Sequence, residues 1–271
     1  MMPGGLPEHY AMLRGKCALI TGSTSGLGLA IANRLAGEGC NMVLNGLAAD
    51  DDVKILLDDL TRKHRIGAVY HAANLTDAAQ IADMMRFAAV TFGRVDVLIN
   101  NAVVRHSARI EEFPVECWNQ ALAVNLSAAF HSVRLALPAM REQDWGRIVN
   151  VASVYSFFAT PNRVGYVTTK TALLGLTRSV ALETAGTGIT CNAVCPGTLP
   201  TSAIESRIQG IAAEQKIPLE QARAEYLAAR QPGGRYIPME TVTGLIAFLC
   251  GPTSAGINGA ALTVDSGWTV S

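Results

Sequence analysis

The sequence predicts an α/β fold, a doubly wound sheet of seven mainly parallel strands with helices on both faces. Short apolar runs alternate with segments of helical periodicity along nearly the whole chain, which is the pattern of repeated βαβ units. A glycine-rich turn joins the first apolar run to the first helical segment, as a tight strand-to-helix connection requires. The 271 residues are ordinary for one large α/β unit, so we expect a single domain over 1–271.

Seven apolar runs are the expected strands, and each is followed by a helical pattern or a loop. They lie at 17–21, 41–44, 68–72, 95–100, 147–151, 190–195 and 261–264. In a doubly wound sheet, ligands bind at the carboxyl ends of the strands, where the strand order reverses. The glycine turn, Asn100, Ser153 and Pro196 all follow strand ends. We therefore expect them to converge on one edge of the sheet.

The segment 1–13 is expected to be an N-terminal extension rather than a targeting signal. It is interrupted by prolines, glycines and charged residues, and it lacks the apolar core of a signal peptide. No stretch of the chain approaches the roughly 18 apolar residues that a membrane span needs. These features predict a cytoplasmic location.

Composition excludes several classes of partner and site. The 22 Lys and Arg residues balance 22 Asp and Glu residues, so there is no electrostatic case for nucleic acid or an anionic membrane. The six cysteines form no Cys-x-x-Cys pair and share no metal-binding spacing with histidines. We expect no metal site and no disulfide, because small buried thiols are the simpler interpretation.

The glycine turn is the expected phosphate-binding segment. After the first strand the chain reads TGSTSGLG over 21–28. Gly22 would allow a sharp turn, Gly26 a close approach to a pyrophosphate, and Gly28 close packing of the helix on the sheet. The spacing departs from the G-x-G-x-x-G fingerprint of dinucleotide sites, so an ordinary strand-to-helix turn is the alternative interpretation.

Ser153, Tyr166 and Lys170 are the expected proton-transfer residues. Tyr166 and Lys170 are four residues apart and share one face of a helix. A nearby ammonium lowers the pKa of a phenol, whose ordinary value is about 10, so Tyr166 is a candidate acid and base near neutral pH. A single Tyr and Lys pair also occurs on solvated helix faces, so the assignment depends on the rest of the chain.

With both motifs present, the chain resembles the short-chain dehydrogenase/reductase family over nearly its whole length. The matching residues are those of 21–28, Asn100, Asn101, Ala102, Asn125, Ser153, Tyr166, Lys170, Pro196 and Gly197. The resemblance implies a Rossmann-type fold, hydride transfer with a nicotinamide cofactor and assembly as a homotetramer. It assigns proton transfer to Tyr166, orientation of the reacting oxygen to Ser153, and a bound water to Asn125. Lys170 would lower the phenol pKa and bind the ribose. A polar residue at a helix kink is the alternative for Asn125.

NAD is the expected cofactor, with NADP less favoured. The residues expected to contact it are Gly22, Thr24, Ser25, Gly26, Leu27, Gly28, Asn45, Asn74, Leu75, Asn101, Ala102, Tyr166, Lys170, Pro196, Gly197 and Thr201. A 2′-phosphate requires Arg or Lys near the end of the second strand, and 45–50 contains neither. The acidic residue that often binds a free 2′-hydroxyl is also missing there, so the preference for NAD could be loose.

A narrower resemblance is to bacterial D-3-hydroxybutyrate dehydrogenases. It is carried by 44–46, 112–114, 125–128, 145–148, 181–186, 231–232 and 267–269. At positions where those enzymes surround the substrate with Gln, His, Lys, Lys and Trp, this chain has Arg105, Tyr155, Arg163, Ser206 and Thr198.

We expect Arg105, Ser153, Tyr155, Arg163 and Thr198 to contact the substrate. Two arginines suit an anion through bidentate contacts, so a small anionic hydroxy acid similar to 3-hydroxybutyrate is predicted, and the changed pocket residues make 3-hydroxybutyrate itself a less favoured substrate. The alternative is that both arginines are solvated loop residues. Other functions to weigh are an NAD(P)H-dependent reductase of a neutral ketone, sugar or cyclic alcohol, and a non-enzymatic dinucleotide-sensing regulator. The complete set of four catalytic residues argues against the regulator.

The segment 198–238 is expected to be a helical lid over the substrate. Helical patterns at 202–215 and 219–230 precede a Pro-Gly-Gly break. The segment begins directly after the predicted cofactor contact at Gly197, where a helical insertion can close a site. A contact between subunits is the alternative.

Overall fold

The computed structural model describes residues 12–271, which form one seven-stranded sheet. The strands are β1 Cys17–Ile20, β2 Asn41–Asn45, β3 Ala68–His71, β4 Val97–Asn100, β5 Gly146–Val151, β6 Ile189–Pro196 and β7 Ala261–Val264. Their order is β3-β2-β1-β4-β5-β6-β7, and every pair is parallel. The predicted doubly wound fold is confirmed. The order reverses between β1 and β4, which is where such sheets bind ligands.

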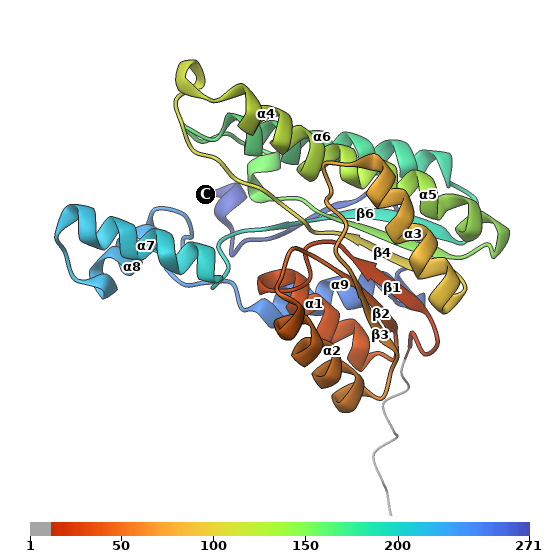
Figure 1. Cartoon of the computed structure of the whole chain (residues 1–271). Helices are drawn as coiled ribbons and strands as arrows, with labels where there is room; N and C mark the ends of the chain where they lie inside the picture. Colours follow the sequence, from red (N-terminus) through yellow and green to blue (C-terminus); the bar gives the residue numbers. More distant parts are fainter. Residues whose placement is uncertain (1–11) are drawn as a thin grey trace, which may run out of the picture.

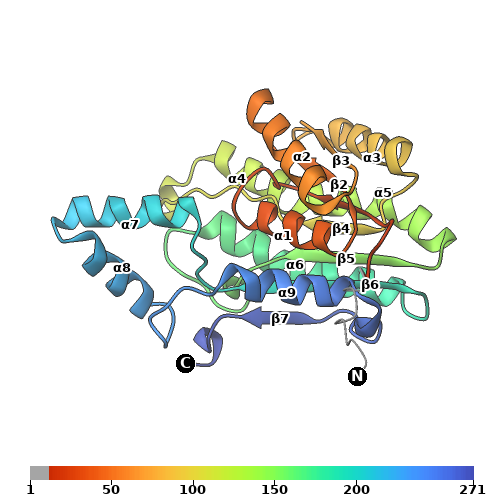
Figure 2. The same ribbon diagram turned by 90° about the horizontal axis from the view of Figure 1, so that it is seen from below.

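Helices cover both faces of the sheet (Figures 1 and 2). They are α1 Gly26–Gly37, α2 Asp50–His64, α3 Ala78–Phe92, α4 Val115–Leu122, α5 Ala128–Glu142, α6 Val164–Glu183, α7 Ser202–Gln215, α8 Leu219–Ala228 and α9 Met239–Cys250. Helices α1, α2 and α9 lie on one face, and α3, α4, α5 and α6 on the other (Figure 1). The central strands are therefore buried on both sides, which explains why they read as continuous apolar runs.

The side chains of β1 show how two cores form on the two faces. Ala18 and Ile20 pack in the core that α1 and α9 cover. Cys17 and Leu19 point to the opposite core, beneath α3 and α5. This alternation follows from the two-residue period of a strand. Of the predicted extension 1–13, residues 1–11 lie outside the described part, and Leu13 is buried in the first core.

Helices α7 and α8 form a unit that projects from the sheet (Figures 1 and 2). Ile208, Ala222, Tyr226 and Leu227 give this pair a small core of its own. The observed bounds of α7 coincide with the predicted helical segment 202–215, and α8 ends two residues before the predicted 230. The pair belongs to the segment expected to be a lid.

The remaining expectations concern membrane spans and cysteines. Among residues 12–271, none of the helices has the length and apolar character to cross a bilayer. All six thiols are free, and five of them are buried. Burial raises the pKa of Cys17 and of Cys250 to about 12, so these thiols are unreactive near neutral pH.

Candidate active site

Two glycines of the turn after β1 are sterically required. Gly22 has φ +62°, and a Cβ there would lie 2.9 Å from Cα of Ala102. A Cβ on Gly28 would lie 2.1 Å from the carbonyl oxygen of Gly22. Helix α1 begins at Gly26, and no side chain caps its first amides. These free N–H groups fit a pyrophosphate, because a helix start favours anions.

A hydroxyl and an amide hold the glycine turn to the end of β4. The Thr21 hydroxyl accepts hydrogen bonds from the backbone N–H groups of Asn101 (3.0 Å) and Ala102 (3.1 Å). The Asn101 side-chain amide donates to the carbonyls of Thr21 and Gly22, each at 2.9 Å. The sequence predicts contacts for Asn101 and Ala102, whereas it gives Thr21 no site role. Thr21 directly precedes Gly22 in the sequence, and this position could have identified it as a site residue.

Asn45 connects the ends of the next two strands to the same turn. Its side-chain oxygen accepts from the Gly22 N–H at 3.4 Å, and its side-chain amide donates to the carbonyls of His71 and Ala73, both at 3.0 Å. Asn45 is 1% exposed. Its side chain is thus a structural link at the floor of the predicted cofactor site.

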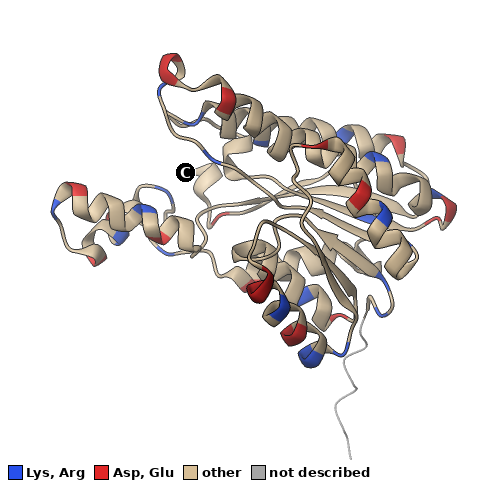
Figure 3. Cartoon of the chain, in the orientation of Figure 1, with Lys and Arg blue, Asp and Glu red and all other residues tan. Residues whose placement is uncertain are grey.

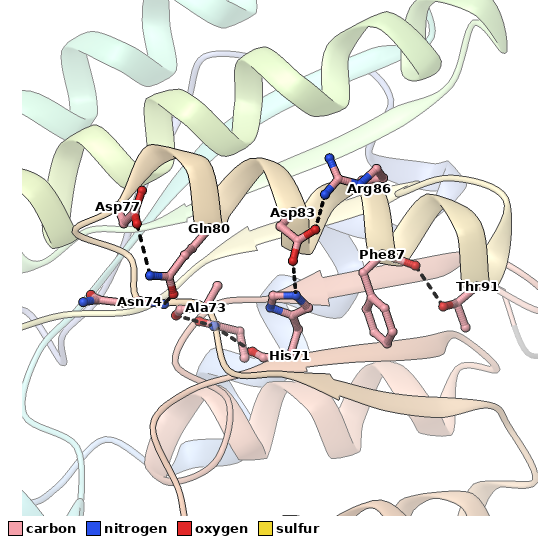
Figure 4. A network of polar contacts seen from close by, with 10 residues as sticks. His71, Ala73, Asn74, Asp77, Gln80, Asp83, Arg86, Phe87 and Thr91 are labelled. Carbon is pink, nitrogen blue, oxygen red and sulfur yellow. Dashed lines mark hydrogen bonds and ion pairs between the residues drawn. The ribbon is translucent and has the colours of Figure 1, made fainter.

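The loop after β3 contains the two residues expected near adenine. Figure 4 shows Asn74 beside Gln80, whose side-chain oxygen accepts from the Asn74 backbone N–H at 2.9 Å. The Asn74 side-chain oxygen accepts from Thr76, and the residue is exposed. Leu75 is buried, with 8% exposure. Asn74 is therefore the more exposed of these two residues.

The three proton-transfer residues lie after β5 and at the start of α6. Ser153 begins the short helical turn Val154–Ser156, and its hydroxyl accepts from the Tyr155 N–H at 3.2 Å. Tyr166 and Lys170 lie in the first two turns of α6. The Lys170 Nζ is 5.9 Å from the Tyr166 ring centroid and donates to the Val151 carbonyl at 2.5 Å. The carbonyl at the end of β5 therefore fixes the lysine beside the phenol.

The pKa of Lys170, the residue expected to supply the ammonium beside Tyr166, is far below its ordinary value. Burial, aided by the nearby Arg105 cation, lowers the pKa of Lys170 to about 7. Removing an ammonium from water disfavours its charged form, and a second cation has the same effect. The charge of Lys170 near neutral pH therefore depends on what else occupies the site. An anion on Arg105 would favour the ammonium.

Asn125 lies in a π-helical turn, Ala123–Ser127, between α4 and α5. Its side-chain oxygen accepts from the Val104 N–H at 2.8 Å, and its amide donates to the Val104 carbonyl and the Thr169 hydroxyl, both at 3.1 Å. Turns of this kind are frequent at functional sites. The side chain ties the loop after β4 to α6, one residue before Lys170. It makes no direct hydrogen bond to Lys170 within residues 12–271.

Arg105 lies against the catalytic candidate Tyr166. The guanidinium carbon is 5.2 Å from the Tyr166 ring centroid, a cation–π distance. Arg163 is the residue directly before α6. Across the described chain, neither arginine forms an ion pair, and neither guanidinium makes a hydrogen bond to another residue. Arg105 thus brings a cation to Tyr166, and Arg163 lies three residues before Tyr166 in the chain.

Thr198 is less accessible than its predicted substrate role requires. It is 5% exposed, and its carbonyl accepts from the Ile237 N–H at 3.0 Å and from the Gln231 amide at 3.2 Å. Gln231 in this way ties the two ends of the projecting segment together. Thr201 precedes α7, and its methyl group would lie 4.0 Å from a Cβ on Gly26. The base of the segment therefore adjoins the glycine turn.

Tyr155 packs among aromatic rings from two strand ends. Its ring centroid is 6.2 Å from that of Tyr166 and 5.5 Å from that of Trp268. Phe158 lies 5.4 Å from Tyr155 and 5.6 Å from Trp268. Sequence reasoning singled out Tyr155 but gave Phe158 and Trp268 no site role. Trp268 follows the end of β7, so the strand-end rule could have found it.

Comparisons with known proteins agree with this architecture. A family model described as short chain dehydrogenase matches residues 16–211. The chain is 43% identical over 257 residues to a D-beta-hydroxybutyrate dehydrogenase of Cupriavidus necator, covering 95% of this chain and 99% of the relative. A D-beta-hydroxybutyrate dehydrogenase of Rhizobium meliloti is 43% identical over 254 residues, covering 94% and 98%.

A solved structure is similar over the same length. L-sorbose reductase from Gluconobacter frateurii, in complex with NADPH and L-sorbose, matches with a TM-score of 0.92 and 26% identity. The match covers 97% of this chain and 99% of that one.

Proposed function

This chain belongs to the short-chain dehydrogenase family and is an oxidoreductase that acts on CH–OH groups, and we propose that it uses NAD to oxidise a small anionic hydroxy acid, or reduces the matching keto acid. The relatives with 43% identity are named for D-beta-hydroxybutyrate, a substrate of this class. Several expected pocket residues of this chain differ from those of the D-3-hydroxybutyrate dehydrogenases that it resembles, and this difference supports a related acid as the substrate.

The proposed chemistry is a proton transfer at Tyr166 coupled to hydride transfer. A bound nicotinamide dinucleotide would supply the hydride acceptor, held by the glycine turn and the uncapped start of α1. Tyr166, ionised, takes the proton of the substrate hydroxyl while the C–H bond of the same carbon breaks. Ser153 donates a hydrogen bond to the reacting oxygen. Lys170, when protonated, favours the phenolate and binds the ribose hydroxyls.

The observation that carries the choice of substrate class is the position of Arg105. Its guanidinium lies 5.2 Å from the Tyr166 ring centroid without an acidic partner among residues 12–271. A carboxylate bound there would lie next to the reacting carbon and would form charge-assisted hydrogen bonds. It would also offset the repulsion that Arg105 exerts on Lys170. Arg163 is the second proposed anion ligand.

The preference for NAD over NADP is proposed from the loop after β2. Gly46, which accepts a hydrogen bond from the Tyr70 hydroxyl at 2.6 Å, is followed by the exposed Leu47. Helix α2 then begins with three acidic residues, 50–52 (Figure 3). A 2′-phosphate would meet these carboxylates and no Lys or Arg in the loop, so the charge favours a free 2′-hydroxyl.

We further infer a cytoplasmic homotetramer with a mobile lid. Large apolar side chains are exposed on three helices of the body, at Phe130, Leu182 and Phe248, and such surfaces suit subunit contacts. The free thiols agree with a reducing compartment. Helices α7 and α8, with their own core, suit rigid movement about the linkers at Thr198 and Gln231.

The test is an oxidation screen of the purified full chain. Small hydroxy acids and neutral secondary alcohols of equal size are assayed with NAD and with NADP, and the formation of reduced cofactor is followed by its absorbance. The proposal expects turnover of at least one acid, with NAD more efficient than NADP. Turnover confined to neutral alcohols would refute the anionic substrate. Equal efficiency with NADP would refute the cofactor preference. Light scattering of the same sample measures the assembly state.

A further inference from the structure

Three aromatic side chains form a cluster at the proposed active site: Tyr155, Phe158 and Trp268. Their ring centroids lie 5.4 to 5.6 Å apart, in edge-to-face or tilted pairs, which are favourable arrangements. None of the three is fully buried. The Tyr155 ring also packs edge-on against Tyr166, at 6.2 Å and 81°. The cluster therefore presents partly exposed apolar surface that begins at the reacting phenol.

The turn that carries Trp268 is firmly built. The Asp265 carboxylate is 8% exposed and accepts from the Gly267 N–H at 3.1 Å, the Thr269 N–H at 2.8 Å and the Thr269 hydroxyl at 2.7 Å. Ser266 adopts φ +52°, a left-handed conformation that a non-glycine residue holds only where its surroundings impose it. The position of Trp268 is thus imposed by hydrogen bonds, although it lies near the C-terminus.

Strand order explains why the cluster belongs to the active site. Tyr155 and Phe158 follow β5, and Trp268 follows β7, and these two strands flank β6 in the sheet. The rings therefore meet across the end of β6, where Gly197 packs against Asp265. The chain leaves β6 toward α7 at the same end of the sheet from which β7 runs to the C-terminus (Figures 1 and 2).

We propose that the aromatic cluster is a subsite for an apolar substituent of the substrate larger than methyl, an aryl ring or a chain of several carbons. This inference rests on the proposed oxidation of an anionic hydroxy acid and names the class within it. The carboxylate lies toward Arg105 and the apolar group on Tyr155, Phe158 and Trp268. A methyl group is too small to reach all three rings, because apolar contacts extend only about 4.0–4.5 Å.

A substrate series tests the subsite. Racemic 3-hydroxybutyrate, 3-hydroxyhexanoate and 3-hydroxy-3-phenylpropanoate are oxidised with NAD by the full chain. We expect kcat/KM for the phenyl acid to exceed that for 3-hydroxybutyrate by at least about tenfold, the discrimination that a few apolar carbons provide. A maximum at 3-hydroxybutyrate would overturn the subsite and leave the proposed function standing. Turnover of none of these three acids would also overturn the subsite, and the wider oxidation screen would then decide the proposed function separately.

Variants of the cluster test whether its rings cause the expected preference for the phenyl acid. We expect Trp268→Ala to lower kcat/KM for the phenyl acid by about tenfold and that for 3-hydroxybutyrate by no more than about twofold. Trp268→Phe is expected to restore most of the loss. Phe158→Ala repeats the test without changing the C-terminal turn. Phe157→Ala is the matched control, because that neighbouring ring is 48% exposed and outside the cluster. Equal losses on both acids would show that the rings only support the fold and would refute the proposal.

Discussion

The site has a floor and a rim that differ in how their side chains are held. The floor consists of Thr21, Asn45, Asn101, Asn125 and Lys170, each hydrogen-bonded to backbone atoms of another segment. The rim consists of Arg105, Arg163 and the aromatic cluster. The rim arginines make no such bonds in the part of the chain that the structure describes.

This difference separates chemistry from selectivity. A floor fixed by backbone groups tolerates little change, because every lost partner leaves a buried polar atom unsatisfied. A rim of side chains that contact mainly each other can change its residues without disturbing the sheet. Three of the five positions at which this chain differs from the enzymes it resembles lie on the rim, namely Arg105, Tyr155 and Arg163, whereas the residues proposed for chemistry match the family pattern.

The largest effect is expected at Tyr166, the point where floor and rim meet. Tyr166→Phe removes the proposed proton acceptor while keeping the ring, so kcat should fall by about 10²–10⁴-fold. Binding of NADH, measured by fluorescence titration, should change little. Tyr226→Phe, which removes a hydroxyl in the small core of α7 and α8, serves as a control outside the reaction centre. Normal turnover in Tyr166→Phe would refute proton transfer by Tyr166.

A steric change tests the rigidity of the floor. Gly28→Ala places a Cβ 2.1 Å from the Gly22 carbonyl oxygen, so we expect the free energy of unfolding to fall by about 1–3 kcal/mol or more and NADH affinity to drop. Gly210→Ala in α7 is the matched control, since nothing lies within 4 Å of its added Cβ. Urea unfolding measures both variants, and equal stabilities would mean that the turn is not tightly packed.

The titration of Lys170, a floor residue, should make the stability of the fold depend on pH. Its pKa is about 7 in the folded chain, against about 10.4 for a free lysine. Between these values the unfolded chain binds more protons, so the free energy of unfolding should rise with pH. From pH 7 to 9 the wild type should gain about 2 kcal/mol relative to Lys170→Met, which cannot titrate.

Urea unfolding at several pH values checks this expectation. Lys54→Met, which removes an exposed lysine of α2, should show no comparable trend. A constant difference between wild type and Lys170→Met would mean that the buried lysine keeps its charge throughout this range.

A smaller effect is expected at the rim residue Arg163. Arg163→Ala should raise KM for a carboxylate substrate by about tenfold, the loss of one charge-assisted contact of roughly 1.4 kcal/mol. kcat and the kinetics of a neutral alcohol should stay nearly constant. Arg178→Ala, on the exposed side of α6, which Arg163 precedes, is the control. An unchanged KM for every anionic substrate would assign Arg163 to the solvated surface.

Much of the fold could be predicted from the sequence, because buried parallel strands leave uninterrupted apolar runs. β7 has the predicted bounds, and β4 begins two residues later than expected, at Val97. The preceding Val95 and Asp96 join the loop, where the Asp96 carboxylate accepts from the Cys17 N–H at 2.9 Å. Strand ends also indicated where the site lies, since all parallel strands end on one edge.

Contacts between distant segments could not be predicted from the sequence. Nothing in the local pattern places Trp268 against Tyr155, because the two follow strands that are separated by β6. The low pKa of Lys170 likewise depends on burial and on Arg105, from another loop. The sequence left two interpretations of Asn125, a residue that binds a water and a residue at a helix kink. It gave no sign of the hydrogen bonds that Asn125 makes to Val104 from a π-helical turn.

The most direct test of the floor and rim account compares an acid with its uncharged isostere. The kcat/KM for 3-hydroxy-3-phenylpropanoate and for the corresponding primary amide is measured with NAD, in the wild type and in Arg105→Gln. We expect the wild type to favour the acid by at least about tenfold and Arg105→Gln to lose most of that ratio while still oxidising the amide. A wild type that oxidises acid and amide equally well would contradict the account.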